Sequence, residues 1–364
     1  MKHFLTAFFF LFVGTIAFAQ ETHYTVTGKV IDKNTKAPLL GASVFAQNTT
    51  FGLATDAEGN FRLKVPNGGY ELVVSFSGYE TESMRISNSI ADQGTIVIEV
   101  RPREKSMAEV SIVATSEVKD GWLKYGQFFT ENFIGNSEIS KQATIKNPEV
   151  LKFYFSKKKN RLKVMASDPV IVTNSALGYI IKFAIDSFSY EYTTNYSQFI
   201  GYPLFEEMHG TSEQESQWKV NRAKAYYGSM LHFMRSFYNK TLKIEGFEIQ
   251  FMVKTKDSEH TIPVNNIYGA LNYDKDDSTK TVAFYPNQPD IVVIYKKAKP
   301  EQGYLDFDPK ANKNFQASIL TIADDEEIVI EQNGYYFDQI NITVNGYLAY
   351  QKVGNLLPYD YYPL

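Results

Sequence analysis

Five polar or aromatic side chains between residues 222 and 235 form the most suggestive chemical set in the sequence. Arg222, Tyr226, Ser229, His232 and Arg235 recur every three or four residues, so a helix would bring them toward one face. Guanidinium, imidazole, hydroxyl and phenol groups together would make a basic, hydrogen-bonding rim for a polar ligand. We favour helix packing with surface ion pairs for this set, and a ligand-binding site made of these five residues is the alternative.

Catalysis by this set is not predicted. Ser229 and His232 are the residue types of a nucleophile and its base, but no Gly-x-Ser-x-Gly turn surrounds the serine. A zinc carboxypeptidase needs a His-x-x-Glu pair and a distant histidine, and no histidine of the mature chain is followed by Glu at the third position. The chain has no cysteine, which excludes disulfides, thiol nucleophiles and Cys-ligated metals. We therefore predict no enzyme, no metal and no cofactor.

The element that must carry this set is one long helix, predicted over residues 212–238. It starts at Ser212, where Ser212 and Glu215 have the spacing of a capping box, and apolar side chains then recur at helical spacing. A second, shorter helix is predicted over residues 121–133 from an aromatic stripe that we assign to the core. Its members are Trp122, Tyr125, Phe128, Phe129 and Phe133.

The first residues predict export. Lys2 precedes an apolar run, and Ala17 and Ala19 give the small-residue pattern at which signal peptidase cleaves, so residues 1–19 are a predicted signal peptide. No later stretch reaches 18 consecutive apolar residues, so we predict no transmembrane helix in the mature chain. The net charge of −4 is mild and its charges are interspersed, which argues against a nucleic-acid partner.

Residues 20–103 predict an all-β domain. Phe61, Leu63 and Val65 alternate with charged residues, which is typical of a strand with one buried face. Two turn-forming stretches, residues 56–60 and 66–69, punctuate the strands, and we predict both as hairpin turns.

The same residues carry a family resemblance. They are Gly28-Lys29-Val30-Ile31-Asp32, Pro38-Leu39-Leu40-Gly41-Ala42-Ser43-Val44, Thr55-Asp56 with Gly59 and Phe61, and Ser75-Phe76-Ser77-Gly78-Tyr79. This run resembles the carboxypeptidase-like regulatory domain, which implies a seven-stranded, transthyretin-like β-sandwich. Such domains are frequent in outer-membrane and secreted proteins of the Bacteroidetes, here followed by an uncharacterised C-terminal region. The resemblance is to a regulatory domain and does not extend to a peptidase.

A linker or strand is predicted over residues 104–120. Its Glu109–Thr115 stretch looks like the TonB box of nutrient receptors, which would recruit that energy-coupling partner. We favour a strand or linker between two domains, and deletion of Glu109–Thr115 would test the alternative.

The remainder predicts a larger antiparallel β-rich domain at residues 121–298, with strands at residues 299–364 packed on it. The predicted fold is mainly β, α+β overall. The leading functional hypothesis is a non-catalytic binding or scaffold protein of the periplasm or outer-membrane periphery, with an envelope protein or a glycan as partner. The alternatives are a hydrolase of cell-envelope or glycan metabolism and an accessory to TonB-linked nutrient uptake.

Overall fold

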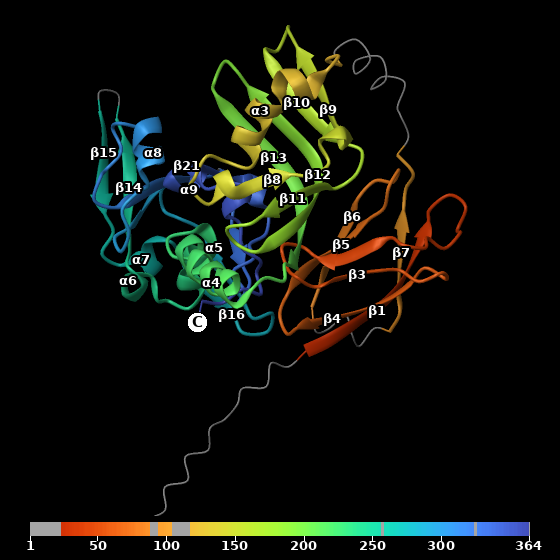
Figure 1. Ribbon diagram of the computed structural model, residues 1–364. Helices are drawn as coiled ribbons and strands as arrows, with labels where there is room; N and C mark the ends of the chain where they lie inside the picture. The colour runs from red at the N-terminus through yellow and green to blue at the C-terminus, as the bar shows by residue number, and fades with distance from the viewer. Residues whose placement is uncertain (1–22, 88–93, 104–116, 256–257, 324–325, 364) are drawn as a thin grey trace, which may run out of the picture.

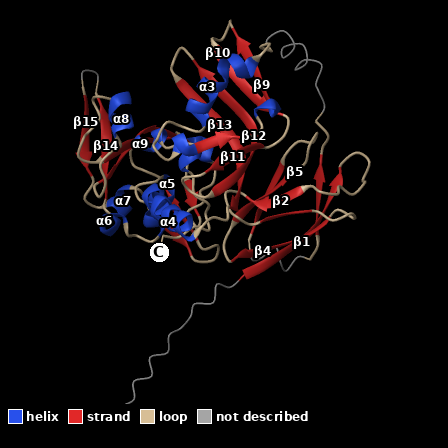
Figure 2. Ribbon diagram, viewed as in Figure 1, coloured by secondary structure: helices blue, strands red, loops and turns tan. Residues whose placement is uncertain are grey.

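The computed structural model describes residues 23–87, 94–103, 117–255, 258–323 and 326–363. The predicted signal peptide and the Glu109–Thr115 stretch lie outside these ranges. Strands dominate the described chain, and they form several mostly antiparallel sheets with short helices between them (Figure 2). The predicted mainly-β class is confirmed.

The first unit is a β-sandwich of seven described strands in two sheets. One sheet has the order β4-β1-β7 and the other β3-β2-β5-β6, and alternate side chains of both sheets fill the core between them. The strands are β1 (His23–Asp32), β2 (Ser43–Ala46), β3 (Gly52–Ala54), β4 (Asn60–Pro66), β5 (Tyr70–Ser75), β6 (Glu82–Ile86) and β7 (Ile96–Val100). In β4, Phe61, Leu63 and Val65 are buried as the alternation predicts.

The two predicted hairpin turns connect strands of different sheets. Residues 56–60 lead from β3 to β4, and residues 66–69 lead from β4 to β5, so neither turn joins two paired strands. The hairpin assignment was therefore wrong, although both stretches do reverse the chain. Gly59 has a φ of 76°, and the Asp56 carboxylate accepts from the backbone N–H of Asn60 at 2.7 Å. Local turn chemistry sets the reversal, and packing of the sandwich decides which sheet receives the next strand.

The second unit is a six-stranded antiparallel sheet, which we call the middle sheet, with a helix on one face. The order is β8-β11-β12-β10-β9, and the long β13 pairs with β12. Helix α3 (Gly121–Phe133) buries Phe129 and Phe133 against this sheet. The strands are β8 (Ala143–Ile145), β9 (Leu151–Ser156), β10 (Arg161–Ala166), β11 (Val170–Asn174), β12 (Tyr179–Glu191) and β13 (Tyr196–Glu207).

The third unit holds two smaller sheets, ordered β15-β14-β18-β19-β21 and β16-β17-β20. Their strands are β14 (Phe247–Lys254), β15 (Glu259–Pro263), β16 (Asp274–Asp276), β17 (Thr281–Phe284), β18 (Asp290–Tyr295), β19 (Gln316–Ile322), β20 (Ile328–Ile330) and β21 (Ile342–Gly346). The predicted boundary at residue 298 falls between the paired strands β18 and β19. Residues 299–364 therefore contribute strands to the same sheet instead of packing on it from outside.

Short helices connect and cover these sheets. The α-helices after α3 are α4 (Ser212–Tyr226), α5 (Met230–Tyr238), α6 (Leu242–Glu245), α7 (Ile267–Ala270), α8 (Gln302–Phe307) and α9 (Tyr347–Tyr350). The 3-10 turns are η1 (Ser140–Gln142), η2 (Pro148–Val150), η3 (Gln339–Asn341) and η4 (Val353–Asn355).

The single helix predicted over residues 212–238 is two helices. The chain is extended at Tyr227, Gly228 takes a φ of 84°, and Ser229 caps the N-terminus of α5. A left-handed glycine followed by an N-cap serine ends one helix and starts another. The cap of α4 is also one residue earlier than predicted, because Thr211 and Gln214 form the capping box.

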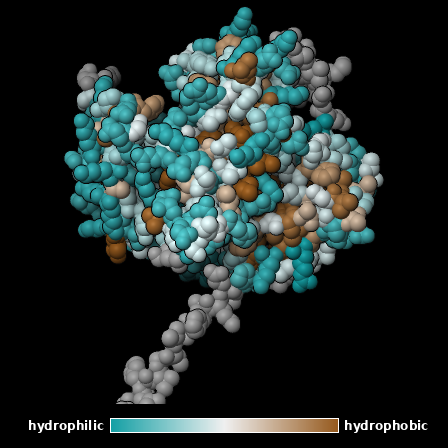
Figure 3. Space-filling view, in the orientation of Figure 1, coloured by the Kyte–Doolittle hydropathy of each residue, from teal (hydrophilic) through white to brown (hydrophobic). Residues whose placement is uncertain are grey.

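The three units lie side by side. Figure 1 shows the sandwich in orange on one side, the β8–β13 sheet at the top and the blue C-terminal strands entering the middle of the molecule. On the face shown in Figure 3, hydrophobic surface gathers near the centre and over the sandwich, while hydrophilic surface covers most of the outer parts.

Candidate functional site

His232 is buried at the start of α5 and hydrogen-bonded through both ring nitrogens. Its Nδ1 accepts from the backbone N–H of Gly228 at 3.1 Å, and its Nε2 lies 3.2 Å from Oε2 of Glu245. Because Nδ1 is an acceptor, Nε2 carries the proton in the neutral ring and donates to the carboxylate. Burial lowers the pKa of His232, and the Glu245 carboxylate opposes that shift without overcoming it.

Ser229 caps α5 and is not paired with the imidazole. Its Oγ accepts from the backbone N–H of His232 at 3.1 Å, whereas the ring nitrogens of His232 are directed to Gly228 and Glu245. A nucleophile–base pair requires a hydrogen bond between hydroxyl and imidazole. The geometry of this pair is that of a helix cap.

Arg222 faces the β12 end of the middle sheet. Its Nε and Nη2 donate to the carbonyl oxygens of Leu177 and Gly178 at 2.7 and 3.2 Å, and its Nη1 pairs with Glu207 at 2.9 Å. The guanidinium also stacks 3.8 Å from the ring centroid of Tyr179. All three guanidinium nitrogens are thus used inside the protein.

Arg235 is a buried cation held by backbone carbonyl groups. Its Nε donates to Asn333 at 2.9 Å, and its Nη1 and Nη2 donate to Tyr361 and Tyr359 at 2.8 Å each. The ring of Tyr226 lies 5.6 Å from the guanidinium carbon. Arg235 therefore binds α5 to residues 356–361, which we call the C-terminal clamp.

The structure brings four of the five predicted residues close together. The ring of Tyr226 lies 4.9 Å from that of His232, Ser229 bonds to the backbone of His232, and Arg235 lies over the Tyr226 ring, whereas Arg222 points away to β12. These side chains contact one another and the protein interior, in agreement with the packing interpretation that we favoured. Their assignment to ligand binding stays a prediction.

The C-terminal clamp also holds the sandwich. The backbone N–H of Tyr359 donates to the Asn48 carbonyl at 2.6 Å, and the Asp360 carboxylate accepts from both the backbone and the hydroxyl of Thr50. Asn48 Nδ2 donates to the Leu357 carbonyl at 3.2 Å, whereas its buried Oδ1 has no hydrogen-bond partner in the described part of the chain. The β2–β3 turn is thus fixed by the last described segment.

A second contact joins the sandwich to the third unit through a buried acid. The Glu331 side chain is 2% exposed and accepts from Nη2 of Arg85 at 2.7 Å. A Cβ atom at Gly69 would lie 2.0 Å from Oε1 of Glu331, so the backbone approaches the carboxylate closely there. Burial raises the pKa of Glu331, and the Arg85 guanidinium only partly offsets this.

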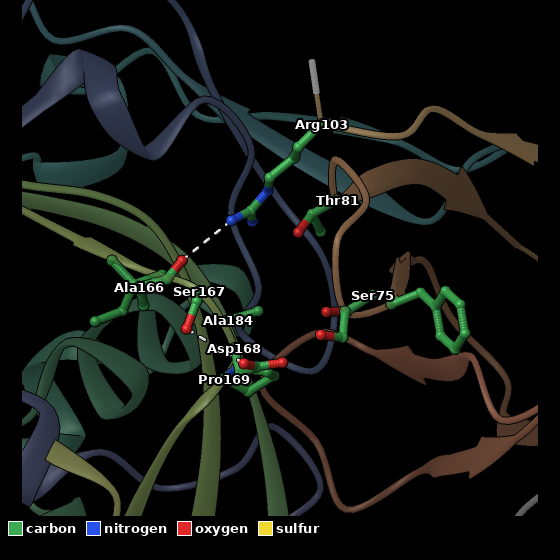
Figure 4. A pocket seen from close by; sticks show the side chains of 11 residues that line it. Ser75, Thr81, Arg103, Ala166, Ser167, Asp168, Pro169 and Ala184 are labelled. Carbon is green, nitrogen blue, oxygen red and sulfur yellow. Dashed lines mark hydrogen bonds between the residues drawn. The ribbon is translucent and has the colours of Figure 1, made fainter. Parts of the chain in front are cut away.

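A small hollow lies where the sandwich meets the middle sheet. It has a volume of about 10 Å³, which is room for about one water molecule. Figure 4 shows Arg103 reaching across it to donate to the Ala166 carbonyl at 3.1 Å, and Ser167 donating to Asp168 at 3.2 Å. The hollow is lined by Ser75, Phe76, Ser77, Thr81, Arg103, Ala166, Ser167, Asp168, Pro169, Ala184 and Ile185. Its size suits hydration of the contact and excludes an organic ligand.

A larger cleft of about 350 Å³ lies beside α3, the helix whose aromatic stripe was predicted to lie in the core. Phe129 and Phe133 are buried as expected, but Trp122 is 37% exposed and lies on the cleft wall. The assignment of Trp122 to the core was therefore wrong. The sequence did contain a signal, because Gly126 stands one helical turn after Trp122 and leaves room for the indole ring beside the helix.

Neither a metal site nor a membrane-spanning helix is present in the described ranges. Nowhere in those ranges do three or more His, Asp or Glu side chains converge to hold a metal ion. No helix there has both the length and the apolar character that crossing a membrane requires.

Comparison with known proteins identifies the sandwich. Residues 26–112 match the CarboxypepD_reg-like domain family. The chain is also 34% identical over 109 residues to the TonB-dependent receptor SusC of Bacteroides thetaiotaomicron, a match that covers 30% of this chain and 10% of the receptor. The chain thus spans only about a tenth of that relative's length.

Two solved structures overlap the chain at low similarity. A DUF3823 family protein from Parabacteroides merdae has a TM-score of 0.18 at 10% identity, covering 52% of this chain and 83% of its own. A protein of unknown function from Bacteroides fragilis, described as membrane-associated, has a TM-score of 0.17 at 11% identity, covering 89% and 95%. Both TM-scores are too low to bear on fold or function. The match assigns residues 26–112 to the CarboxypepD_reg-like domain family, and the seven-stranded sandwich is the structure of the described part of that region.

Proposed function

We propose that this protein is an exported, non-catalytic binding protein of the cell envelope, in which the regulatory-like sandwich is a built-in structural part. The observation that carries the proposal is the fixed attachment of the sandwich. Asn48 and Thr50 bond to the C-terminal clamp, and Arg85 bonds to the buried Glu331. A tethered module that moves freely would not bury such polar contacts, since each buried group needs its partner.

The hydrogen bonds made by Ser229, His232 and Arg235 inside the protein favour a binding role over catalysis. Ser229 caps a helix, His232 is locked between Gly228 and Glu245, and Arg235 binds carbonyl groups. A regulatory-like domain is itself non-catalytic. The match to a TonB-dependent receptor agrees with an envelope setting.

The proposal is tested by fractionation and partner capture. The full gene is expressed in a Bacteroidetes host, and the protein is followed with antibodies through cytoplasmic, periplasmic, membrane and medium fractions. After crosslinking, an envelope protein or a glycan should copurify with it. Retention in the cytoplasm, or turnover of a peptide or glycan that follows the purified protein through several columns, would overturn the proposal.

A second candidate function is an accessory role in TonB-linked uptake, favoured by the SusC match over 109 residues. It requires the Glu109–Thr115 stretch to contact the coupling machinery. Deletion of this stretch should then abolish copurification with TonB while leaving the melting temperature unchanged. Equal TonB recovery from the deletion variant and the wild type would dismiss this candidate.

A further inference from the structure

The cleft beside α3 is walled by one aromatic side chain and several polar ones. It is lined by Trp122, Gly126, Gln127, Thr130, Glu131, Gly135, Asn136, Ser140, Lys141 and Ala143. Its volume of about 350 Å³ lies within the usual range for small-molecule sites, about 300–1,000 Å³. It is distinct from the α4–α5 cluster and from the hollow beside Arg103.

The indole of Trp122 is held in a defined place. A Cβ atom at Gly126 would lie 2.7 Å from the indole, so the ring lies against the helix backbone where any larger residue would displace it. The ring of Phe153 supports it from the sheet at a centroid distance of 6.3 Å. The exposed part of the ring is therefore a fixed apolar surface at the edge of the cleft.

The polar groups that line the cleft are of mixed character. Gln127 donates to Glu131 at 2.9 Å, which orients both an amide and a carboxylate. Within the described part of the chain, neither the side-chain amide of Asn136 nor the Lys141 ammonium has a hydrogen-bond partner, so both are available to a ligand. The wall is fixed by Ser140, whose hydroxyl donates to Asn355 at 2.8 Å.

We propose that this cleft binds a neutral saccharide, with one sugar ring stacked on Trp122. Sugars present an apolar C–H face and a rim of hydroxyl groups, each of which donates and accepts. An aromatic platform matches the first, and amide, carboxylate and ammonium groups match the second. The inference deepens the proposed binding function and rests on it.

Other ligand chemistries fit less well. A phosphate or a nucleotide would meet the Glu131 carboxylate with Lys141 as its one matching cation among the lining residues. An apolar ligand would leave the Asn136 amide and the Lys141 ammonium without partners. A protein partner bound to α3 would contact Leu123, which is 86% exposed and does not line the cleft. A Leu123 variant therefore distinguishes a protein partner from a ligand in the cleft.

The test measures binding of defined neutral oligosaccharides to the whole mature chain. Maltoheptaose, cellohexaose, xylohexaose, mannohexaose and chitohexaose are titrated while tryptophan emission is recorded, and calorimetry confirms saturable binding. At least one should bind and shift the emission of the exposed Trp122. The W122A variant should bind that sugar about tenfold more weakly or worse, W122F should bind at an intermediate level, and N136A should lose several-fold.

L123A is the matched control, since Leu123 is on the same helix, more exposed and outside the cleft lining. It should bind within about twofold of the wild type. Buried Trp218 remains in W122A and reports its fold by emission.

Three outcomes would overturn the inference. These are no binding of any probe, unchanged binding in W122A (or in W122F where W122A does not fold), and a loss in L123A equal to that in W122A. Partner capture in the fractionation experiment would still uphold the binding function in each case, so the two failures are distinguishable.

Discussion

The guanidinium of Arg235 donates to the carbonyl oxygen of Tyr359 at 2.8 Å, which joins a helix of the middle of the chain to its last described segment. The same segment receives the sandwich turn at Asn48. The buried Arg235 side chain thereby helps to hold three units together, and its removal should lower the stability of the whole fold.

Arg235→Met should strongly destabilise the fold. The variant loses three charge-assisted hydrogen bonds and leaves carbonyl groups of Asn333, Tyr359 and Tyr361 without their donor, a loss of about 3 kcal/mol or more in the free energy of unfolding. Urea unfolding followed by circular dichroism measures it. Arg62→Met on the exposed face of β4 is the control and should change stability by less than about 0.5 kcal/mol. Equal effects in both variants would contradict the assignment.

His232 should make the protein less stable in mild acid. Burial lowers its pKa below the ordinary value of 6.5, so below that pH the unfolded chain binds a proton that the folded chain excludes. The free energy of unfolding therefore decreases as pH falls from 6.5 toward the lowered pKa. The groups that act on the ring are Glu245, which favours the proton, and Lys297 and Arg235, which oppose it.

The variant that checks this is His232→Phe, which keeps a ring but cannot titrate. It should be about 1–3 kcal/mol less stable than the wild type at pH 7.5, because the Gly228 N–H loses its acceptor. That difference should shrink at pH 5 in urea titrations. A difference that stays constant between the two pH values would mean that His232 does not titrate in this way.

Replacing Arg85 alone should lower the free energy of unfolding more than replacing Arg85 and Glu331 together. Arg85→Met leaves a buried carboxylate without its cation, whereas the double variant with Glu331→Gln leaves no charge. The double variant should therefore be the more stable of the two in thermal unfolding. Because Arg85 is about half exposed, the single variant should lose a few kcal/mol at most. Additive losses would show that the two side chains are not coupled.

The two neighbouring candidates for the α4 cap can be separated directly. Thr211→Ala removes the side chain that accepts from the Gln214 N–H and should cost about 1 kcal/mol. Ser212→Ala, one residue along, should be nearly neutral. A larger loss for Ser212→Ala would move the cap to the position that the sequence first suggested.

The sequence predicted features set by local pattern and missed those set by distant contacts. Alternation around Phe61 gave β4, and the turn residues near Gly59 gave a reversal. The pairing of strands after that turn depends on the whole sandwich, and no local pattern reveals it. Gly228 followed by Ser229 was a local signal for a break between two helices, and the close approach of Gln316 and Tyr295, which leaves no room for a Cβ at Gly228, comes from residues far along the chain.

The candidate sites show the same division. Tyr226 and His232 do lie together, but across the break between α4 and α5 and not on one helix as the spacing predicted, and the carboxylate that bonds the His232 ring comes from Glu245. Trp122 follows the helical period of a core stripe, and Gly126 one turn later was the local sign that its ring lies beside the helix.

The contact between Asn48 and Leu357 spans 309 residues. Contacts of such sequence separation close the largest loops in a chain and are expected late in folding. The strands of the sandwich pair with one another within about 75 residues of sequence, so the sandwich can fold before its contact with residues 356–361 forms. Its β2–β3 turn also bonds to β13 through Asn48 and Thr49, and it would complete its contacts only when residues 356–361 arrive, so a slow arrival would prolong the exposure of the immature protein to proteases and aggregation.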